Sequence, residues 1–242
     1  MTEIKICGIT CLEDALCAAR SGADALGFIF YPPSRRCVSP EQARRIRAGL
    51  PRGIVTVGVF VNQDATFVED IAGTCGLDMI QLHGDEPPEY CRRFSRERLI
   101  RAVWPAASMD ISVLGAYPVK AFLADGRDAD RRGGTGRTAD WTLSAALGRA
   151  FPLVLAGGLR EDNIREALTA VRPRAVDINS GIETALGIKD HERMRRIIAI
   201  VRAADREAGE SGDEDGPAIF CRLFPGADRG SFDVPGTRKD KP

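Results

Sequence analysis

The sequence has no net charge at neutral pH, because 34 basic and 34 acidic side chains balance. A general nucleic-acid-binding protein needs a basic surface, so the balance argues against one. No apolar run approaches the ~18 residues that span a bilayer. The amino terminus enters a strand pattern directly instead of a basic and then apolar leader, so we expect no signal peptide. We therefore expect neither a nucleic acid nor a membrane among the partners.

Paired cysteine motifs are also missing. The chain has seven cysteines, an odd number, and no Cys-x-x-Cys pair, so we expect neither a disulfide framework nor a zinc ribbon. Its only histidines, His83 and His191, are too few for a histidine-rich metal centre. Reduced thiols in the cytoplasm are the simpler interpretation. We predict a cytoplasmic protein with no metal and no cofactor.

Short apolar segments do recur, and they alternate with helical patterns from the first residues to about Ala203. Several, such as Ala25–Phe30, are apolar almost throughout, which is typical of parallel strands buried on both faces. We expect strands at Glu3–Cys7, Ala25–Phe30, Val55–Val61, Met79–Leu82, Leu99–Val103, Val119–Ala124, Leu153–Ala156 and Ala175–Ile178. Eight strand–helix units predict a single-domain (β/α)8 TIM barrel over residues 1–204. An open doubly wound sheet is the alternative, although no Gly-x-Gly-x-x-Gly motif follows the first strand.

Two helix starts carry specific capping signals. Thr10 is expected to cap the first helix, with Glu13 completing the box. Ser39 followed by Pro40 predicts the start of the second helix. The remaining helices are expected at Asp64–Ala72, Pro87–Phe94, Thr138–Leu147, Asp162–Val171 and Asp190–Ala204, with a weaker candidate at Ser108–Leu114.

The composition changes after residue 204. Residues 207–216 are acidic and rich in glycine, and the end of the chain is polar. We interpret residues 205–242 as a flexible carboxyl-terminal tail. An apolar patch interrupts it at Ile219, Phe220, Leu223 and Phe224. Docking of this patch on the barrel or on a partner is the alternative interpretation.

The candidate functional residues stand at predicted strand ends, because the active site of such a barrel forms at the carboxyl ends of its strands. Gly157-Gly158 and Ser180-Gly181 follow the seventh and eighth strands. Glycines there let backbone N–H groups approach an anion, and barrels often bind phosphate at this place. Gly134, within Gly133-Gly134-Thr135-Gly136, is a further candidate donor. Tight turns without a ligand are the alternative.

Cys7 and Asp125 end the first and sixth strands and are candidates for an acid–base pair. A thiol with a reference pKa of ~8.5 is acidified by a nearby cation and can then remove a carbon-bound proton. An aspartic acid with a raised pKa can supply a proton. Packing for Cys7 and helix capping for Asp125 are the alternatives.

Two further residues are candidates for contacts with a substrate. Arg36, in a loop above the barrel mouth, is suited to a bidentate pair with a substrate carboxylate, whereas its neighbour Arg35 is expected in solvent. His83, at the end of the fourth strand, is expected to contact substrate or support the site.

The motifs in combination resemble the phosphoribosylanthranilate isomerase family of tryptophan biosynthesis. They are Lys5-Ile6-Cys7-Gly8-Ile9-Thr10, Gly22–Phe28, Ser34-Arg35-Arg36 with Ser39-Pro40, Val57–Asn62, Gln81-Leu82-His83-Gly84, Asp125 before Gly133-Gly134-Thr135-Gly136, Ala156-Gly157-Gly158-Leu159 and Val176–Glu183. They run in family order over about residues 3–204. One departure is Asn179, where the family usually has serine.

The resemblance implies an isomerase without a cofactor that acts on a phosphorylated small molecule, as a monomer or homodimer. The reaction would be the Amadori rearrangement of N-(5'-phosphoribosyl)anthranilate. By the same resemblance Asp125 is the general acid, Cys7 the general base, and Arg36 the contact for the anthranilate carboxylate. The glycine loops would hold the phosphate.

Other functions remain open at this point. The histidine-pathway isomerase performs the same chemistry but has an aspartate where Cys7 stands. Indole-glycerol-phosphate synthase needs a lysine at a strand end, and neither Lys5 nor Lys120 fits. A metal-dependent epimerase needs more histidines. A barrel that binds a phosphorylated ligand without turnover, or a scaffold whose tail recruits a partner, is the non-enzymatic alternative.

Overall fold

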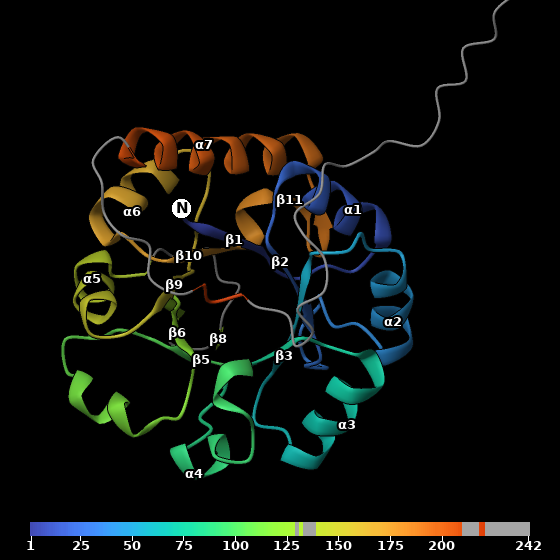
Figure 1. The fold of residues 1–242 in the computed structure, drawn as a ribbon, viewed down its shortest axis with the longest axis horizontal. Helices are drawn as coiled ribbons and strands as arrows, with labels where there is room; N and C mark the ends of the chain where they lie inside the picture. The colour runs from blue at the N-terminus through green and yellow to red at the C-terminus, as the bar shows by residue number, and fades with distance from the viewer. Residues whose placement is uncertain (129–130, 133–138, 210–217, 221–242) are drawn as a thin grey trace, which may run out of the picture.

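The structure is a computed structural model, and it describes residues 1–128, 131–132, 139–209 and 218–220. Its centre is a closed barrel of eight parallel strands in the order β1-β10-β9-β6-β5-β4-β3-β2. The barrel strands are β1 (Glu3–Ile6), β2 (Ala25–Ile29), β3 (Val55–Phe60), β4 (Met79–Leu82), β5 (Leu99–Val103), β6 (Ala121–Ala124), β9 (Leu153–Leu155) and β10 (Ala175–Ile178). Figure 1 looks down the barrel, with helices around the ring. The predicted TIM barrel is confirmed.

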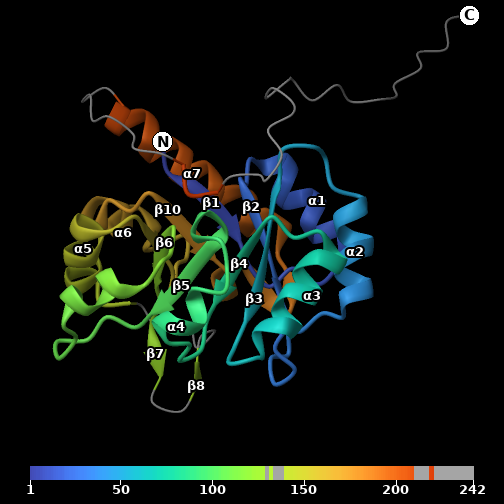
Figure 2. The same cartoon turned by 60° about the horizontal axis from the view of Figure 1, so that its bottom comes forward.

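Helices connect the strands on the outside of the barrel. They are α1 (Leu12–Ser21), α2 (Pro40–Ala48), α3 (Ala65–Cys75), the short α4 (Pro88–Cys91), α5 (Trp141–Ala150), α6 (Ile164–Val171) and α7 (His191–Gly209). Three 3-10 turns lie at Arg96–Arg98, Ile111–Ala116 and Ser180–Ile182. Two small antiparallel pairs, β7 (Arg127–Asp128) with β8 (Arg131–Arg132) and β11 (Glu183–Ala185) with β12 (Ile188–Lys189), were not expected. Figure 2 shows β7 and β8 at the end of the barrel away from the amino terminus.

Alternation along each strand divides the core into two parts, because successive side chains point to opposite faces. On β1, Ile4 and Ile6 face the helices and join the outer core. Lys5 and Cys7 have the opposite parity and face the barrel interior. Phe28 on β2 is fully buried in the outer core, where such a side chain contributes roughly 2–3 kcal/mol. The side chains that line the interior, such as Val57, form a second, separate hydrophobic cluster.

The structure confirms the predicted cap at Ser39 and contradicts the predicted cap at Thr10. The Ser39 hydroxyl accepts a hydrogen bond from the backbone N–H of Gln42 at 3.1 Å, as expected for an N-cap. The prediction for Thr10 was wrong, because α1 begins at Leu12 and its N-cap residue is Cys11. The Thr10 hydroxyl instead donates to the carbonyl of Gly187 at 2.6 Å, a partner that only the folded barrel brings near.

The last helix fastens the amino terminus to the barrel. It continues to Gly209, five residues past the end that we predicted, so residue 204 lies inside α7. Arg202 forms an ion pair with Asp24 at 2.8 Å and donates to the carbonyl of Thr2 at 2.6 Å. Asp205 accepts from the backbone N–H of Thr2 at 2.9 Å. The end of α7 and the start of β1 therefore lie side by side.

Candidate active site

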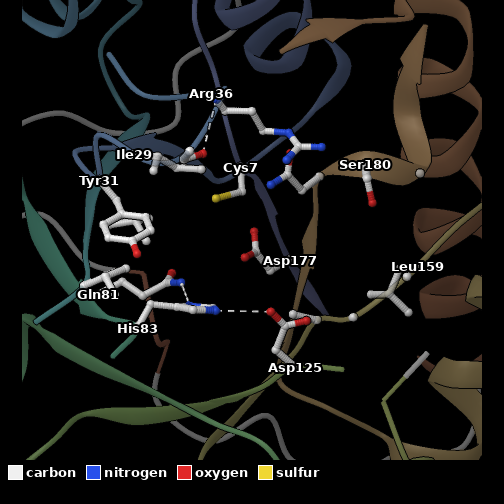
Figure 3. A pocket seen from close by; sticks show the side chains of 18 residues that line it. Cys7, Ile29, Tyr31, Arg36, Gln81, His83, Asp125, Leu159, Asp177 and Ser180 are labelled. Atoms are coloured by element: carbon white, nitrogen blue, oxygen red, sulfur yellow. Dashed lines mark hydrogen bonds and ion pairs between the residues drawn. The ribbon is translucent and has the colours of Figure 1, made fainter. Parts of the chain in front are cut away.

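A pocket opens at the carboxyl ends of the strands and gathers almost all the candidate residues. Its empty space is about 770 Å³ with the open mouth included. Eight predicted residues line it: Cys7, Arg36, His83, Asp125, Gly157, Gly158, Ser180 and Gly181. The ninth, Gly134, lies outside the described residues. Figure 3 shows Cys7, Asp125 and Asp177 around this cavity.

Cys7 stands just after β1 and is buried, with 4% of its surface exposed. Beneath it, the Lys5 ammonium forms an ion pair with Asp177 at 2.9 Å, and Lys5 is fully buried. Gly27 of β2 makes this arrangement possible. A Cβ atom there would lie 2.7 Å from the Cys7 sulfur and 3.1 Å from the Lys5 nitrogen. The thiol and the ammonium thus share a space that a larger residue on β2 would close.

The surroundings of Cys7 have opposing effects on its pKa, and the net direction is upward, whereas we expected an acidified thiol. Burial raises the pKa of Cys7, and the Asp177 carboxylate raises it further. The ammonium groups of Lys5 and Lys189 lower it, but not enough to reverse the direction. Burial lowers the pKa of Lys5, yet Asp177 and Cys7 more than offset this and leave it raised. Burial and Asp177 therefore favour the protonated thiol, and Lys5 stays protonated.

Asp125 follows β6 on another part of the pocket wall and is held by two donors. Its Oδ1 accepts from the backbone N–H of Gly126 at 2.8 Å, and its Oδ2 lies 3.2 Å from His83 Nε2. The Gln81 amide lies 3.0 Å from His83 Nδ1 through its Nε2. If that amide nitrogen donates, His83 carries its proton on Nε2 and donates it to Asp125. The Trp104 ring packs against His83 edge-on, 5.6 Å between centroids.

One edge of the Arg36 guanidinium is occupied by Glu183, and the predicted pair with a substrate carboxylate would use its other edge. Its Nε and Nη2 donate to the two carboxylate oxygens of Glu183 at 2.7 and 2.6 Å. Lys189 also donates to Glu183, at 3.0 Å, and to the Asn179 side chain at 2.8 Å. Hydrogen bonding to Glu183 raises the pKa of Arg36. Arg35 is exposed, as expected.

The ionisation states of this cluster follow from the same contacts. Burial raises the pKa of Glu183, but Arg36 and Lys189 outweigh it and hold the pKa below its ordinary value. Burial lowers the pKa of Lys189, a shift that Glu183 only partly offsets. A fixed carboxylate therefore sits behind Arg36 and orients its guanidinium toward the pocket.

The two glycine loops contact each other at the rim of the pocket. Gly157 and Gly158 both adopt positive φ angles, +81° and +63°, which favour glycine. A Cβ atom on Gly181 would lie only 2.0 Å from the carbonyl oxygen of Leu159. The loops after β9 and β10 therefore leave no room for a side chain at Gly157 or Gly181, and these glycines line the pocket. Among the described residues, no group of three or more His, Cys, Asp or Glu side chains is placed to hold a metal ion.

Sequence reasoning missed several polar residues of the pocket. Asp177 lines it, and one of its buried oxygens, Oδ1, has no hydrogen-bond partner among the described residues. Gln81 and Asn179 also line it. The signal was the strand period: Lys5 is two residues before Cys7, and Asp177 is two residues before Asn179, so each pair shares the interior face. We considered only strand ends and set Lys5 aside.

The fold and the pocket define the class of protein: a (β/α)8 barrel with a polar site at the carboxyl ends of its strands. Comparisons with known proteins narrow this class. The model of the family "N-(5'phosphoribosyl)anthranilate (PRA) isomerase" matches residues 4–200. The N-(5'-phosphoribosyl)anthranilate isomerase of Syntrophus aciditrophicus is 53% identical over 202 residues, which are 84% of this chain and 88% of that protein.

Solved structures agree with the sequence comparison. The phosphoribosyl anthranilate isomerase of Thermotoga maritima is 43% identical, with a TM-score of 0.76, over 84% of this chain and 100% of its own. A phosphoribosyl anthranilate isomerase in complex with reduced 1-(o-carboxyphenylamino)-1-deoxyribulose 5-phosphate is 41% identical, with a TM-score of 0.74 and the same coverage. The chain therefore belongs to the N-(5'-phosphoribosyl)anthranilate isomerase family, whose members are isomerases of tryptophan biosynthesis. No described helix is both long and apolar enough to cross a membrane.

Proposed function

We propose that this chain rearranges N-(5'-phosphoribosyl)anthranilate to 1-(2-carboxyphenylamino)-1-deoxyribulose 5-phosphate, with Asp125 as general acid and Cys7 as general base. One observation carries the assignment of roles: both side chains line the same pocket, from β6 and β1, and each has its own polar supports. A solved relative holds a reduced form of this product. The two ends of such a ligand carry a carboxylate and a phosphate.

The first step is ring opening. Asp125 gives its proton to the ribose ring oxygen, the C1'–O bond breaks, and the nitrogen lone pair forms the C1'=N bond of a protonated Schiff base. The donors that hold Asp125, the Gly126 N–H and His83, then stabilise the carboxylate that remains. The Gly126 N–H and the His83 ring thus favour the ionised Asp125 that this step produces.

The second step is proton abstraction at C2'. Cys7 must be a thiolate to act, and its raised pKa opposes this. The protonated Schiff base brings a positive charge beside the thiol, which favours the thiolate and acidifies the C2' proton together. The proton of the thiol passes through solvent to the Asp125 carboxylate, which restores the acid, and Cys7 regains a proton from C2'. The resulting enolamine becomes the ketone when the C2' hydroxyl loses a proton and C1' gains one. Atoms and charges then balance with no cofactor.

The two ends of the substrate are held by groups that do not react. The guanidinium of Arg36 has five N–H groups and uses two on Glu183, so three remain for the anthranilate carboxylate. Backbone N–H groups of the loops at Gly157-Gly158 and Ser180-Gly181 would hold the phosphate. The orphan oxygen of Asp177 would accept from a ribose hydroxyl. Fixing both ends places the sugar between acid and base.

The test is loss of substrate fluorescence on mixing purified chain with freshly generated phosphoribosylanthranilate. We expect turnover by the wild type and losses of at least ~10² in Cys7→Ala and Asp125→Ala. Cys17→Ala is the matched control, because Cys17 is also a buried thiol but lies on α1. A folded wild type without turnover would reject the reaction, and a Cys7→Ala variant as active as Cys17→Ala would reject the base. The histidine-pathway substrate, assayed in parallel, tests specificity.

We also propose a cytoplasmic enzyme that is a monomer or a homodimer, with its catalytic residues in the barrel and none in the carboxyl-terminal tail. One relative in Thermotoga maritima is described as a dimeric enzyme that yields monomers. Light scattering on the purified chain decides between the two states. Fluorescent fusion of the full chain in its host tests the location.

A further inference from the structure

The carboxyl-terminal segment contributes two side chains to the interior of the barrel. Ile219 and Phe220 are 1% and 7% exposed, and they belong to the interior cluster rather than to the outer core. In Figure 1 residues 218–220 form the short orange-red piece over the middle of the ring of strands. The other members of the cluster are Ala25, Val55, Val57, Met79, Ile100, Ala102, Ala121, Leu123, Val154, Ala156 and Ala175.

The amino-terminal end of the barrel has room for these side chains because alanine stands at three of its interior positions, with the larger Val55 and Met79 at two others. Ala25, Ala121 and Ala175 are each the first residue of their strand. Barrel interiors are normally filled by layers of bulky branched side chains. Three alanines leave such a layer underfilled, and a void in the interior forfeits packing contacts. Ile219 and Phe220 supply the missing volume.

A polar contact fixes the segment as well. The carboxylate of Glu3, at the start of β1, accepts from the backbone N–H of Ile219 at 2.6 Å and from that of Phe220 at 3.1 Å. Burial raises the pKa of Glu3; these two hydrogen bonds and Lys120 lower it, Asp24 raises it, and the net direction is upward. One carboxylate thus pairs with two successive backbone donors, a geometry that a loosely placed chain would not keep.

The chain reaches this place without difficulty. Contacts of Arg202 and Asp205 with Thr2 show that α7 ends beside the start of β1, at the same end of the barrel as Glu3. Eight residues, 210–217, separate α7 from Ala218, and an extended chain of that length spans at most roughly 30 Å. The matched family region ends at residue 200. Relatives matched over 100% of their length align with only 84% of this chain, so the barrels of those relatives form without a counterpart of this segment.

We propose that the amino-terminal end of the barrel is a peptide-binding site, formed by its interior apolar wall and the Glu3 carboxylate, and that residues 218–220 of the same chain occupy it. The ligand class is an extended apolar dipeptide with two adjacent backbone N–H donors. Its role is to close the barrel at the end opposite the pocket and to stabilise the fold. Turnover does not depend on it.

The first test is amide hydrogen exchange on the full chain, read residue by residue. The Ile219 and Phe220 amides should be protected in the wild type, because both donate to Glu3. In Phe220→Asp they should exchange at the rate of a free peptide while the β3 and β4 amides stay protected, because a charge cannot enter the apolar site unpaired. Unprotected amides in the wild type, or undiminished protection in Phe220→Asp, would overturn the proposal.

The second test is stability. Phe220→Ala in the full chain should lower the melting temperature by at least about 6 °C. Phe67→Ala is the matched control, since Phe67 lies on α3 with 44% exposure and should change the temperature by about 2 °C or less. Both variants should keep wild-type kcat. Equal melting temperatures for the two variants would contradict a stabilising segment.

The third test asks whether the site works between separate molecules. A labelled peptide of residues 216–223, with Cys221→Ser, is titrated into the chain that ends at Gly209. Saturable binding that the same peptide with Phe220→Asp fails to show supports the proposal, and no binding to a folded barrel rejects it. If the shortened chain does not fold, the exchange experiment on the full chain still decides.

Discussion

Replacing Lys5 by methionine is the sharpest test of the electrostatics beneath the thiol. The Lys5 ammonium lies 2.9 Å from the Asp177 carboxylate, and the two side chains are 0% and 7% exposed. Methionine keeps most of the length and removes the charge. The variant therefore leaves Asp177 as a buried carboxylate without its cation, directly beside Cys7.

The expected cost follows from distance and burial. At 2.9 Å and an effective dielectric constant of about 20, the attraction is about 6 kcal/mol before the desolvation of both groups is subtracted. Removing one partner of a buried pair typically costs about 3–5 kcal/mol. We expect Lys5→Met to lose that much of its free energy of unfolding. Lys5 also lowers the pKa of Cys7, so turnover at neutral pH should fall in the variant.

Urea unfolding followed by circular dichroism measures the stability change. Lys5→Met/Asp177→Asn, which removes both charges, should be more stable than Lys5→Met alone by at least ~1.5 kcal/mol. Arg93→Met is the control, because Arg93 pairs with Glu69 at 3.4 Å on the surface and should cost less than ~1 kcal/mol. A loss in Lys5→Met no larger than in Arg93→Met, or a double variant less stable than the single one, would refute the reasoning.

Three further expectations follow from the pocket. The thiolate absorbance that distinguishes wild type from Cys7→Ser should titrate above the ordinary thiol pKa, because burial and Asp177 raise it; a midpoint near neutrality would contradict this. Glu183→Gln should raise KM about tenfold and change kcat less, since one charged arm behind Arg36 is lost; an effect on kcat alone would argue against an anchoring role. Gln81→Leu should lower kcat roughly tenfold with little change in KM, because it removes the partner of His83 Nδ1, and wild-type kcat would exclude that support.

The barrel was predictable from the sequence because its strands are buried on both faces. The apolar run at Ala25–Phe30 corresponds to β2 at Ala25–Ile29, and no other element type accounts for eight such runs between helical patterns. Element ends were less predictable. The cap assigned to Thr10 failed because its partner, Gly187, is 177 residues away, and local propensity carries no information about such a contact.

The candidate site was predictable where a residue follows a strand and was missed where it lies within one. Lys5 and Asp177 are direct partners in the register of β1 with β10, the pair of strands that closes the barrel. In the sequence, Lys5 and Asp177 are each a single charged residue within an apolar strand. Only closure of the ring makes Lys5 and Asp177 neighbours, so a search limited to residues at strand ends does not pair them. Lys5 lies two residues before Cys7, and this spacing could have placed both Lys5 and Cys7 inside the barrel.

The carboxyl-terminal segment shows the same limit from the other side. Its composition predicts a flexible tail, and the apolar patch at Ile219, Phe220, Leu223 and Phe224 has no periodic pattern that would favour the alternative, docking on the barrel. The complementary signal was in the barrel: alanine at the first position of three strands, Ala25, Ala121 and Ala175, together with an acidic Glu3 on the interior face. Barrel interiors must be filled, so small residues at one end of the ring imply that another part of the chain fills the space. A polar tail with one apolar patch is then the segment to examine, because its Ile219 and Phe220 can supply the volume.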